Sequence, residues 1–422
     1  MHKNLTVTAS LWLLLACAPA ASRAAEIGHM TPPPPVTDAR IAALPPGQQA
    51  PWRAYLAHSR ALAAADKAAL ALERGAGPIP ADPPEGRNGG SGMPLERSAD
   101  WYGTPVARHV ADQIVSFQTP AGGWGKNVDR RGPLRQRGQN WVATGASYVG
   151  TIDNNATTTE LRFLARVQAR TPGADGARYR DSFLKGLRYL SEAQYPNGGF
   201  PQVFPLEGGY HDAITFNDDA LVDVAGLFQS VVAREGDYAF VPPAVAGQAQ
   251  EAVDKVVRLI LATQVVTGDV RTAWGQQHDA LTLAPVGARN FEPIALVSRE
   301  SGGVLMFLMA LPSPSPQVVS AVHAGAAWLQ RAALRDIAWT GGASPQGRRR
   351  VASPGDGPIW ARYYELATMR PIFGDRDRSI HDDVNELSLE RRNGYGWYGS
   401  WPTSVLAAYD TWSRAHPQAP RP

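Results

Sequence analysis

The chain has 422 residues, of which 44% are hydrophobic and 19% are charged, so it is long enough to bury a large core. This composition excludes a fibrous or wholly disordered protein. The formal net charge of +3 excludes the strong basic excess typical of nucleic-acid-binding proteins, and we expect no nucleic-acid partner.

The first 25 residues have the order of a secretory signal peptide. Lys3 precedes an apolar run over 11–16, and small residues follow over 21–25. The run is too short to span a bilayer, so we expect no membrane span and a secreted or periplasmic protein. The alternative is a buried helix at the start of a domain.

The only cysteine, Cys17, lies inside this leader. Lipid attachment at Cys17 would give a lipoprotein, whereas cleavage near Ala25 would leave a mature chain without a thiol. A chain without cysteine binds a metal through oxygen or imidazole ligands, which disfavours a structural zinc site.

Residues 26–95 form an extension rich in Pro, Ala and Gly, with prolines over 32–35 and glycines over 89–92. We interpret it as a linker and packing extension with one helix over 52–73. The remaining residues, 96–422, are expected to form one domain.

Apolar residues at helical spacing recur along this domain, and strand signals are few and short. One example is the face formed by Val253, Val256, Val257, Ile260 and Leu261. Further apolar helical faces are predicted over 110–117, 161–167, 183–190 and 221–231. The domain is therefore predicted to be all-α.

The chain also contains an internal repeat with the pattern Gln-x-Pro-x-Gly-Gly-aromatic. It occurs over 118–124 and again over 194–200, and a looser third copy is expected at Gln264–Trp274. Proline ends a helix, and glycine permits a turn with positive φ. Repeated helix, turn and aromatic units favour an α/α toroid, in which helical hairpins surround a central axis. The alternative is two chance Gly-Gly turns.

Acidic and amide residues stand at two helix starts. Asp153 lies in the segment 151–157 before one helix, and Asp212, Asp218 and Asp219 lie in 211–220 before another. Helix capping explains such residues one by one. Oxygen ligands that converge from several helix starts would instead suit calcium, which takes roughly 6–8 of them.

Arginine residues stand out in the second half. Arg289 is followed by Glu292 in 288–293, and Ser298, Glu300 and Ser301 begin the next helix, where the serines could cap it. Arg289 has no such local role in the sequence. Near the end, arginines interleave with aromatic residues over 360–377 and 395–401, which favours an acidic polysaccharide as partner, with surface salt bridges as the alternative.

In this order, the motifs resemble those of the pectate lyases of polysaccharide lyase family ten. The resemblance extends from about Trp101 to Trp401, and each motif is weak alone. The motifs are Gly122-Gly123-Trp124-Gly125-Lys126-Asn127, Asp153-Asn154-Asn155-Ala156-Thr157, Ile214-Thr215-Phe216-Asn217-Asp218-Asp219-Ala220, Arg289-Asn290-Phe291-Glu292-Pro293 and Met369-Arg370-Pro371-Ile372-Phe373. The family often has Asn where this chain has Met369, a position expected to be structural.

The resemblance implies an α/α toroid with an open groove and a Ca²⁺ ion shared between protein carboxylates and the substrate's uronate. Asp153 matches the family's metal-binding aspartate, and Asp218 matches its partner, with Asp212 and Asp219 as alternatives. Arg289 matches the Brønsted base. The expected substrate contacts are Arg362, Arg376, Lys126, Trp124, Asn217 and Asn154.

The implied reaction is β-elimination of polygalacturonate. The C5 proton of galacturonate is α to a carboxylate, so cations that neutralise this carboxylate acidify the proton. An arginine normally stays protonated. A surrounding cluster of Ca²⁺, Arg362 and Arg376 is expected to lower the pKa of Arg289.

Two other functions fit the same residues. A glycoside hydrolase on a toroid would use two carboxylates among Asp153, Asp218, Glu292 and Glu300. A non-catalytic uronate-binding module would bind the polymer without turnover. In each case we expect a monomer.

Overall fold

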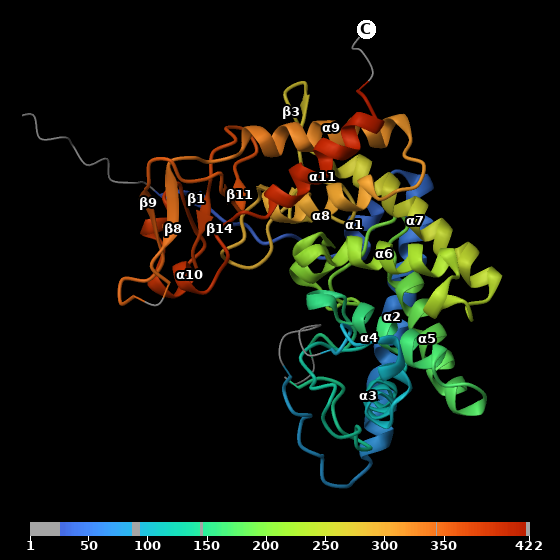
Figure 1. Ribbon diagram of the computed structural model, residues 1–422. Coiled ribbons are helices and arrows are strands. Elements are labelled where there is room, and N and C mark those ends of the chain that lie inside the picture. Colours follow the sequence, from blue (N-terminus) through green and yellow to red (C-terminus); the bar gives the residue numbers. More distant parts are fainter. Residues whose placement is uncertain (1–25, 87–92, 144–146, 343, 419–422) are drawn as a thin grey trace, which may run out of the picture.

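The computed structural model describes residues 26–86, 93–143, 147–342 and 344–418 (Figure 1). The predicted leader over 1–25, with Cys17, and the glycines over 89–92 lie outside these residues. Within the described residues, 11 α-helices account for most of the regular structure, and the strands are short. The prediction of a mainly helical chain is confirmed.

Eight of the helices form two layers. One layer contains α3 (Pro105–Ser116), α5 (Ala174–Ala193), α7 (Pro243–Thr263) and α9 (Pro316–Arg331). The other contains α4 (Thr158–Ala169), α6 (Ala220–Ala233), α8 (Ser298–Met309) and α11 (Pro402–Ala415). Neighbouring helices contact each other within each layer, and α4–α5, α6–α7 and α8–α9 contact across the layers.

In Figure 1 the layers run from α3 at one end to α9 and α11 at the other. Each helix buries the apolar face that its periodicity predicts; in α7, for example, Val253, Val256 and Ile260 belong to the core. Closure of the helical hairpins around a central axis stays a prediction.

The repeat has a structural purpose, because its glutamine joins one helical unit to the next. Gln118 donates through Nε2 to the carbonyls of Gly122 and Ser182, and Gln194 donates likewise to Gly198 and Ala252. In the third copy, Gln264 donates to Thr272 and Ala321. The looser third copy is therefore confirmed.

The Gly-Gly turn lets the chain pass close to the neighbouring helix. A Cβ atom at Gly123 would lie 2.4 Å from the ring of Tyr189, and one at Gly199 would lie 2.6 Å from Ile214. The aromatic residue after the turn then packs inward, and Trp124 Nε1 donates to the carbonyl of Ile114.

The other elements are short and connect these helices. The remaining helical segments are α1 (Asp38–Ala42), α2 (Pro46–Arg74), α10 (Leu389–Asn393), and 3₁₀ turns at Ala99–Gly103, Asp153–Asn155, Gly209–Asp212, Asn217–Asp219, Gly236–Tyr238 and Val384–Glu386. The strands are β1 (Glu26–His29), β2 (Ile214–Thr215), β3 (Val266–Thr267), β4 (Val270–Arg271), β5 (Gln277–His278), β6 (Pro285–Val286), β7 (Leu296–Val297), β8 (Ile337–Thr340), β9 (Arg349–Ala352), β10 (Trp360–Ala361), β11 (Tyr363–Tyr364), β12 (Phe373–Gly374), β13 (Ser379–His381) and β14 (Tyr398–Gly399).

These strands pair antiparallel in small sheets, among them β1–β13–β12, β2–β5–β6 and the hairpin β8–β9. The pairing of β7 with β11 connects the start of α8 to the segment that carries Arg362.

The N-terminal extension packs against the helical layers. Its long helix α2 begins six residues before the predicted start, and it buries Trp52, whose ring lies 4.9 Å from that of Tyr195. The side chain of Asp66 accepts a hydrogen bond from the backbone N–H of Ala121 at 2.9 Å. Arg40, in α1, forms an ion pair with Asp279 at 2.6 Å. The described part of the extension therefore packs on the helical layers, and its division from the rest of the chain stays a prediction.

None of the helices in the described ranges combines the length and the hydrophobicity that a bilayer crossing needs.

Candidate active site

Asp153 lies in the 3₁₀ turn before α4, where Asn154 adopts a left-handed φ of 52°. It is buried, and its two carboxylate oxygens bind different side chains. Oδ2 lies 2.5 Å from Nζ of Lys126, and Oδ1 accepts a hydrogen bond of 2.8 Å from Nε2 of Gln202. Asp153 is therefore held by two side chains that come from the ends of two successive repeats. This arrangement exceeds what a helix cap requires.

The repeats explain how these partners reach Asp153. Four polar residues each stand two positions after a buried aromatic residue: Lys126 after Trp124, Gln202 after Phe200, Gln276 after Trp274 and Arg362 after Trp360. The first two bind Asp153, and the last two bind Oδ1 of Asn217. The fold thus delivers one polar side chain from each unit to the turns before α4 and α6.

Asp218 occupies the corresponding turn before α6, with a left-handed φ of 51°. Its Oδ1 lies 2.5 Å from Nη1 of Arg299 and 3.6 Å from Nη2 of Arg362. The turns that carry Asp153 and Asp218 contact each other. Two carboxylates from separate helix starts are therefore brought to adjacent turns, as the sequence predicts.

Arg362 is a buried cation. Its Nη2 pairs with the buried carboxylate of Glu300 and donates to Oδ1 of Asn217 at 3.3 Å. Burial alone would lower the pKa of Arg362, but the surrounding acidic groups, with Glu300 the strongest of them, together outweigh burial and raise the pKa. Arg362 therefore stays charged beside Asp218.

Arg289 forms an ion pair within its own motif. Its Nε donates to Oε2 of Glu292 at 2.8 Å, and its Nη2 contacts Oε1. Glu292 is buried and also accepts a hydrogen bond of 2.8 Å from the hydroxyl of Tyr395. The Arg289 side chain remains 43% exposed. The sequence-based view that Arg289 lacks a local partner is wrong.

This pairing also changes the proton affinity of Arg289. Burial alone would lower the pKa of Arg289, but the hydrogen bonds and charge of Glu292 outweigh it and raise the pKa above its usual range. For Glu292, burial raises the pKa, but Arg289 lowers it by a larger amount. The expected lowering of the pKa of Arg289 does not occur in this state of the protein.

Phe291 gathers three arginines. The guanidinium carbons of Arg289 and Arg376 each lie 4.9 Å from the centre of its ring, and that of Arg391 lies 4.1 Å from it. The Arg376 side chain is 58% exposed and pairs with Glu390 at 3.1 Å. Arg289 and Arg376 are therefore close together, as the prediction of a shared substrate site requires.

Two predicted site residues have other roles. Trp124 has an exposed fraction of 0% and belongs to the core, so its predicted contact with substrate is wrong. Asp212 is also buried, and its oxygens accept hydrogen bonds from the backbone N–H groups of Val36 and Gly208. We therefore remove Asp212 from the metal ligands, because it instead connects the extension to the turn before β2.

The predicted helix caps are also wrong. Ser298 Oγ donates to the carbonyl of Ala361, and Ser301 Oγ accepts from the backbone N–H of Trp274. Both serines connect the first turn of α8 to neighbouring segments. Asn154 is half-buried in the turn that begins with Asp153, which places it beside the site.

The sequence analysis missed a cluster beside Lys126. Its ammonium nitrogen lies 3.5 Å from the centre of the Tyr148 ring, and the Tyr148 hydroxyl bonds to Tyr210 at 2.9 Å and to His211 at 2.8 Å. Burial lowers the pKa of His211, which favours the neutral ring. No sequence motif marks these residues.

Four polar residues were also missed. Gln202 and Gln276 could have been found from the sequence, because each stands two residues after the aromatic residue of a repeat. No sequence pattern marks Arg299 and Arg391, because their roles depend on contacts between distant segments. Their contacts add two cations to the site.

The candidate site combines many cations with a few carboxylates. The cations Lys126, Arg289, Arg299, Arg362, Arg376 and Arg391 lie around the buried or half-buried carboxylates of Asp153, Asp218, Glu292 and Glu300. Such a surface suits a polyanion.

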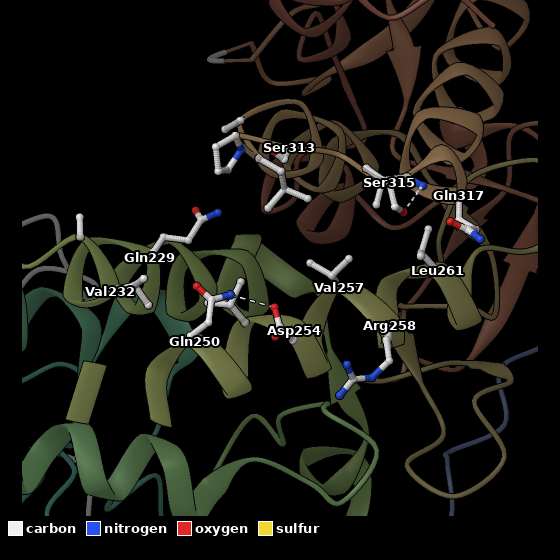
Figure 2. A pocket seen from close by; sticks show the side chains of 16 residues that line it. Gln229, Val232, Gln250, Asp254, Val257, Arg258, Leu261, Ser313, Ser315 and Gln317 are labelled. Atoms are coloured by element: carbon white, nitrogen blue, oxygen red, sulfur yellow. Dashed lines mark hydrogen bonds between the residues drawn. The ribbon is translucent and has the colours of Figure 1, made fainter. Parts of the chain in front are cut away.

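A separate cavity of about 790 Å³ lies between α6, α7 and the loop before α9, and none of the site residues lines it (Figure 2).

Comparison with known proteins agrees with the geometry. The family model for pectic acid lyase matches residues 118–406. Two solved structures match the chain, and both are family 10 polysaccharide lyases from Cellvibrio cellulosa at 33% sequence identity, covering 76% of this chain and 97% of theirs. One of them, with a TM-score of 0.66, is an aspartate-to-alanine variant in complex with trigalacturonic acid, and the other has a TM-score of 0.65.

Among the curated proteins, none matches the chain. The family match covers more than half of the sequence and contains all the motifs around Asp153, Asp218 and Arg289. The chain therefore belongs to the pectic acid lyase family and is a polysaccharide lyase.

Proposed function

We propose that the protein cleaves α-1,4-polygalacturonate by calcium-assisted β-elimination, with Arg289 as the Brønsted base. The observation that carries this proposal is the placement of Asp153 and Asp218 on two adjacent turns, inside a group of arginines. The complex of the Cellvibrio lyase with trigalacturonic acid supports a galacturonate substrate.

The cations of the site supply the recognition of a uronate. Arg362 is buried, stays charged and has a fixed position, whereas the exposed Arg376 can turn toward a substrate carboxylate. The exposed guanidinium of Arg376 can grip a carboxylate through two parallel hydrogen bonds, and Arg362 is proposed to contribute its positive charge from its buried position. Lys126, Asn154 and Asn217 are proposed as further substrate contacts.

The donor atoms fit Ca²⁺. Asp153, Asp218 and Asn217 offer oxygen atoms, and within the described part of the chain Oε1 of Gln202, beside Asp153, is buried without a hydrogen-bond partner. In the same ranges no cluster of three acidic or histidine side chains is arranged to hold a metal. We therefore propose that Asp153 and Asp218 hold the ion and that substrate and water complete its shell. When bound, the ion would acidify the C5 proton by neutralising the adjacent carboxylate.

Arg289 is suited to the proton transfer by its position. Its guanidinium is partly exposed, while Glu292 and Phe291 fix it from the protein side. Arg289 accepts the C5 proton, the C4–O4 bond breaks, a C4–C5 double bond forms, and the departing O4 takes up a proton from water. Arg289 must first lose a proton to water. The positive charges of Arg376 and Arg391 around Phe291, and the exclusion of water by a bound substrate, would favour that loss.

The remaining proposals concern the whole chain. We propose that the helical hairpins form a toroid with an open groove, that residues 1–25 direct export, and that the protein acts as a monomer outside the cytoplasm or, through Cys17, as a lipoprotein.

The hydrolase alternative is not favoured. Glu292 and Glu300 are each paired with an arginine, and the lowered pKa of Glu292 prevents it from serving as a general acid. The family match to lyases points the same way.

The test is absorbance at about 235 nm on polygalacturonate, since elimination creates a conjugated unsaturated uronate. We expect a rise that depends on calcium, stops with chelator and is lost in Arg289→Ala. Reducing ends without absorbance would instead indicate a hydrolase, and polymer binding without either signal would indicate a binding module. Arg376→Ala, which should weaken substrate binding but keep turnover, controls for loss of one exposed cation.

A further inference from the structure

Glu292 is the best-connected carboxylate of the site. Its Oε2 accepts from both the backbone N–H and Nε of Arg289, at 3.0 Å and 2.8 Å. Its Oε1 contacts Nη2 of Arg289 and accepts from Tyr395 at 2.8 Å and from Nε2 of Gln276 at 3.3 Å. With only 3% of its side chain exposed, Glu292 has no room to reach a substrate.

We propose that Glu292 is a positioning residue for Arg289. From the protein side, Glu292 fixes the direction of the Arg289 guanidinium and stabilises its positive charge. This inference rests on the proposed role of Arg289 as the base. Gln276 links Glu292 to the substrate side of the site, since its Nε2 also contacts Oδ1 of Asn217. Glu292 thus connects the base to the turn that carries Asp218.

The charged and titratable groups around the pair determine the sign of its effect. Arg289 interacts electrostatically with Tyr363 and Tyr395, from the C-terminal strands and loop, and with Tyr148 and Tyr210. Arg376 and Arg391 add positive charges around Phe291. Glu292, in contrast, carries a full negative charge and contacts Arg289 directly. Removing that charge should therefore make Arg289 lose its proton at a lower pH.

The chain offers a matched control. Beside Phe291, Glu390 pairs with Arg376 at 3.1 Å and with Arg391 at 3.5 Å, and the side chain of Glu390 is 58% exposed. Glu390→Gln removes the same charge from the same neighbourhood without touching Arg289. A general change in local potential would affect both variants, whereas a contact effect is restricted to Glu292→Gln.

The experiment compares kcat and KM across pH for the wild type, Glu292→Gln, Glu292→Asp and Glu390→Gln, followed at about 235 nm. In Glu292→Gln we expect kcat to rise at a pH that is lower by at least about one unit, which corresponds to a tenfold lower proton affinity of Arg289. Glu390→Gln should keep the wild-type profile. Glu292→Asp keeps the charge but not the reach, so it should keep the wild-type pH profile with a lower kcat and a similar KM.

A lower kcat in Glu292→Gln with an unmoved pH profile would overturn the inference. If Glu292→Gln does not fold, as judged by circular dichroism, an unchanged kcat in Glu292→Asp would overturn it instead. The Arg289→Ala variant distinguishes failure of the proposed base from failure of the role proposed for Glu292. Activity that survives in Arg289→Ala contradicts the proposed base itself, whereas inactive Arg289→Ala with an unshifted Glu292→Gln contradicts only the role of Glu292.

Discussion

The ammonium nitrogen of Lys126 lies 2.5 Å from Oδ2 of Asp153, so a protein cation already neutralises the carboxylate that is proposed to bind calcium. Lys126 and Ca²⁺ would therefore compete for Asp153. The neighbouring ring of Tyr148, 3.5 Å from the same nitrogen, provides a second place for the ammonium.

The first prediction follows from this competition. Lys126→Ala should bind Ca²⁺ about tenfold more tightly in the absence of substrate, because a competing charge is lost, and should show a higher KM for polygalacturonate. Isothermal titration with Ca²⁺ and steady-state kinetics measure the two effects. The exposed Lys255→Ala, on α7, is the control. Equal calcium affinity in both variants would exclude competition at Asp153.

The second prediction separates aspartates that look alike in the sequence. Asp153→Asn and Asp218→Asn should lose calcium-dependent activity by about a hundredfold or more and remain folded. Asp212→Asn should instead be destabilised by about 1–3 kcal/mol, because an amide nitrogen would face a backbone N–H group. Urea unfolding and the calcium dependence of kcat distinguish the cases. If Asp212→Asn changes calcium dependence at unchanged stability, its removal from the metal ligands was wrong.

The third prediction contrasts two arginines with the same proposed task. Arg362→Ala would leave the buried Glu300 without its cation, so the free energy of unfolding should fall by about 3–5 kcal/mol. Arg376→Ala breaks only an exposed pair and should cost less than about 1 kcal/mol, while KM rises. Equal losses of stability would contradict the buried placement of Arg362.

The fourth prediction concerns pH. Burial raises the pKa of Asp66 from 3.8 to about 6, although the Ala121 N–H and Lys185 oppose the shift. The folded state therefore binds more protons than the unfolded state between about pH 4 and 6, and stability falls as pH rises through this window. The ionised carboxylate costs up to about 3 kcal/mol at pH 7.

Asp66→Asn keeps an oxygen for the Ala121 N–H and removes the titration. Relative to the wild type, it should gain stability between pH 4 and pH 7, as measured by urea unfolding at both pH values. The exposed Asp181→Asn serves as control and should show no such gain. A constant difference between Asp66→Asn and the wild type would contradict the buried position of Asp66 in α2.

The sequence by itself determined the features that depend on local order. Helical periodicity located α3 to α7, and the Gln-x-Pro-x-Gly-Gly repeat located the turns at which Gln118, Gln194 and Gln264 make equivalent bonds. The joint order of the motifs indicated the family. These signals are readable because helix packing and turn geometry depend on neighbouring residues.

Only the tertiary structure decided which side chains meet. It placed Trp124 in the core, gave Asp212 to the extension, and brought Arg299 and Arg362 to Asp218. It also paired Arg289 with Glu292, which raises the pKa that the sequence analysis expected to fall. Charges act through space and their strength depends on burial, and neither the distance between two side chains nor their burial is contained in their separation along the chain.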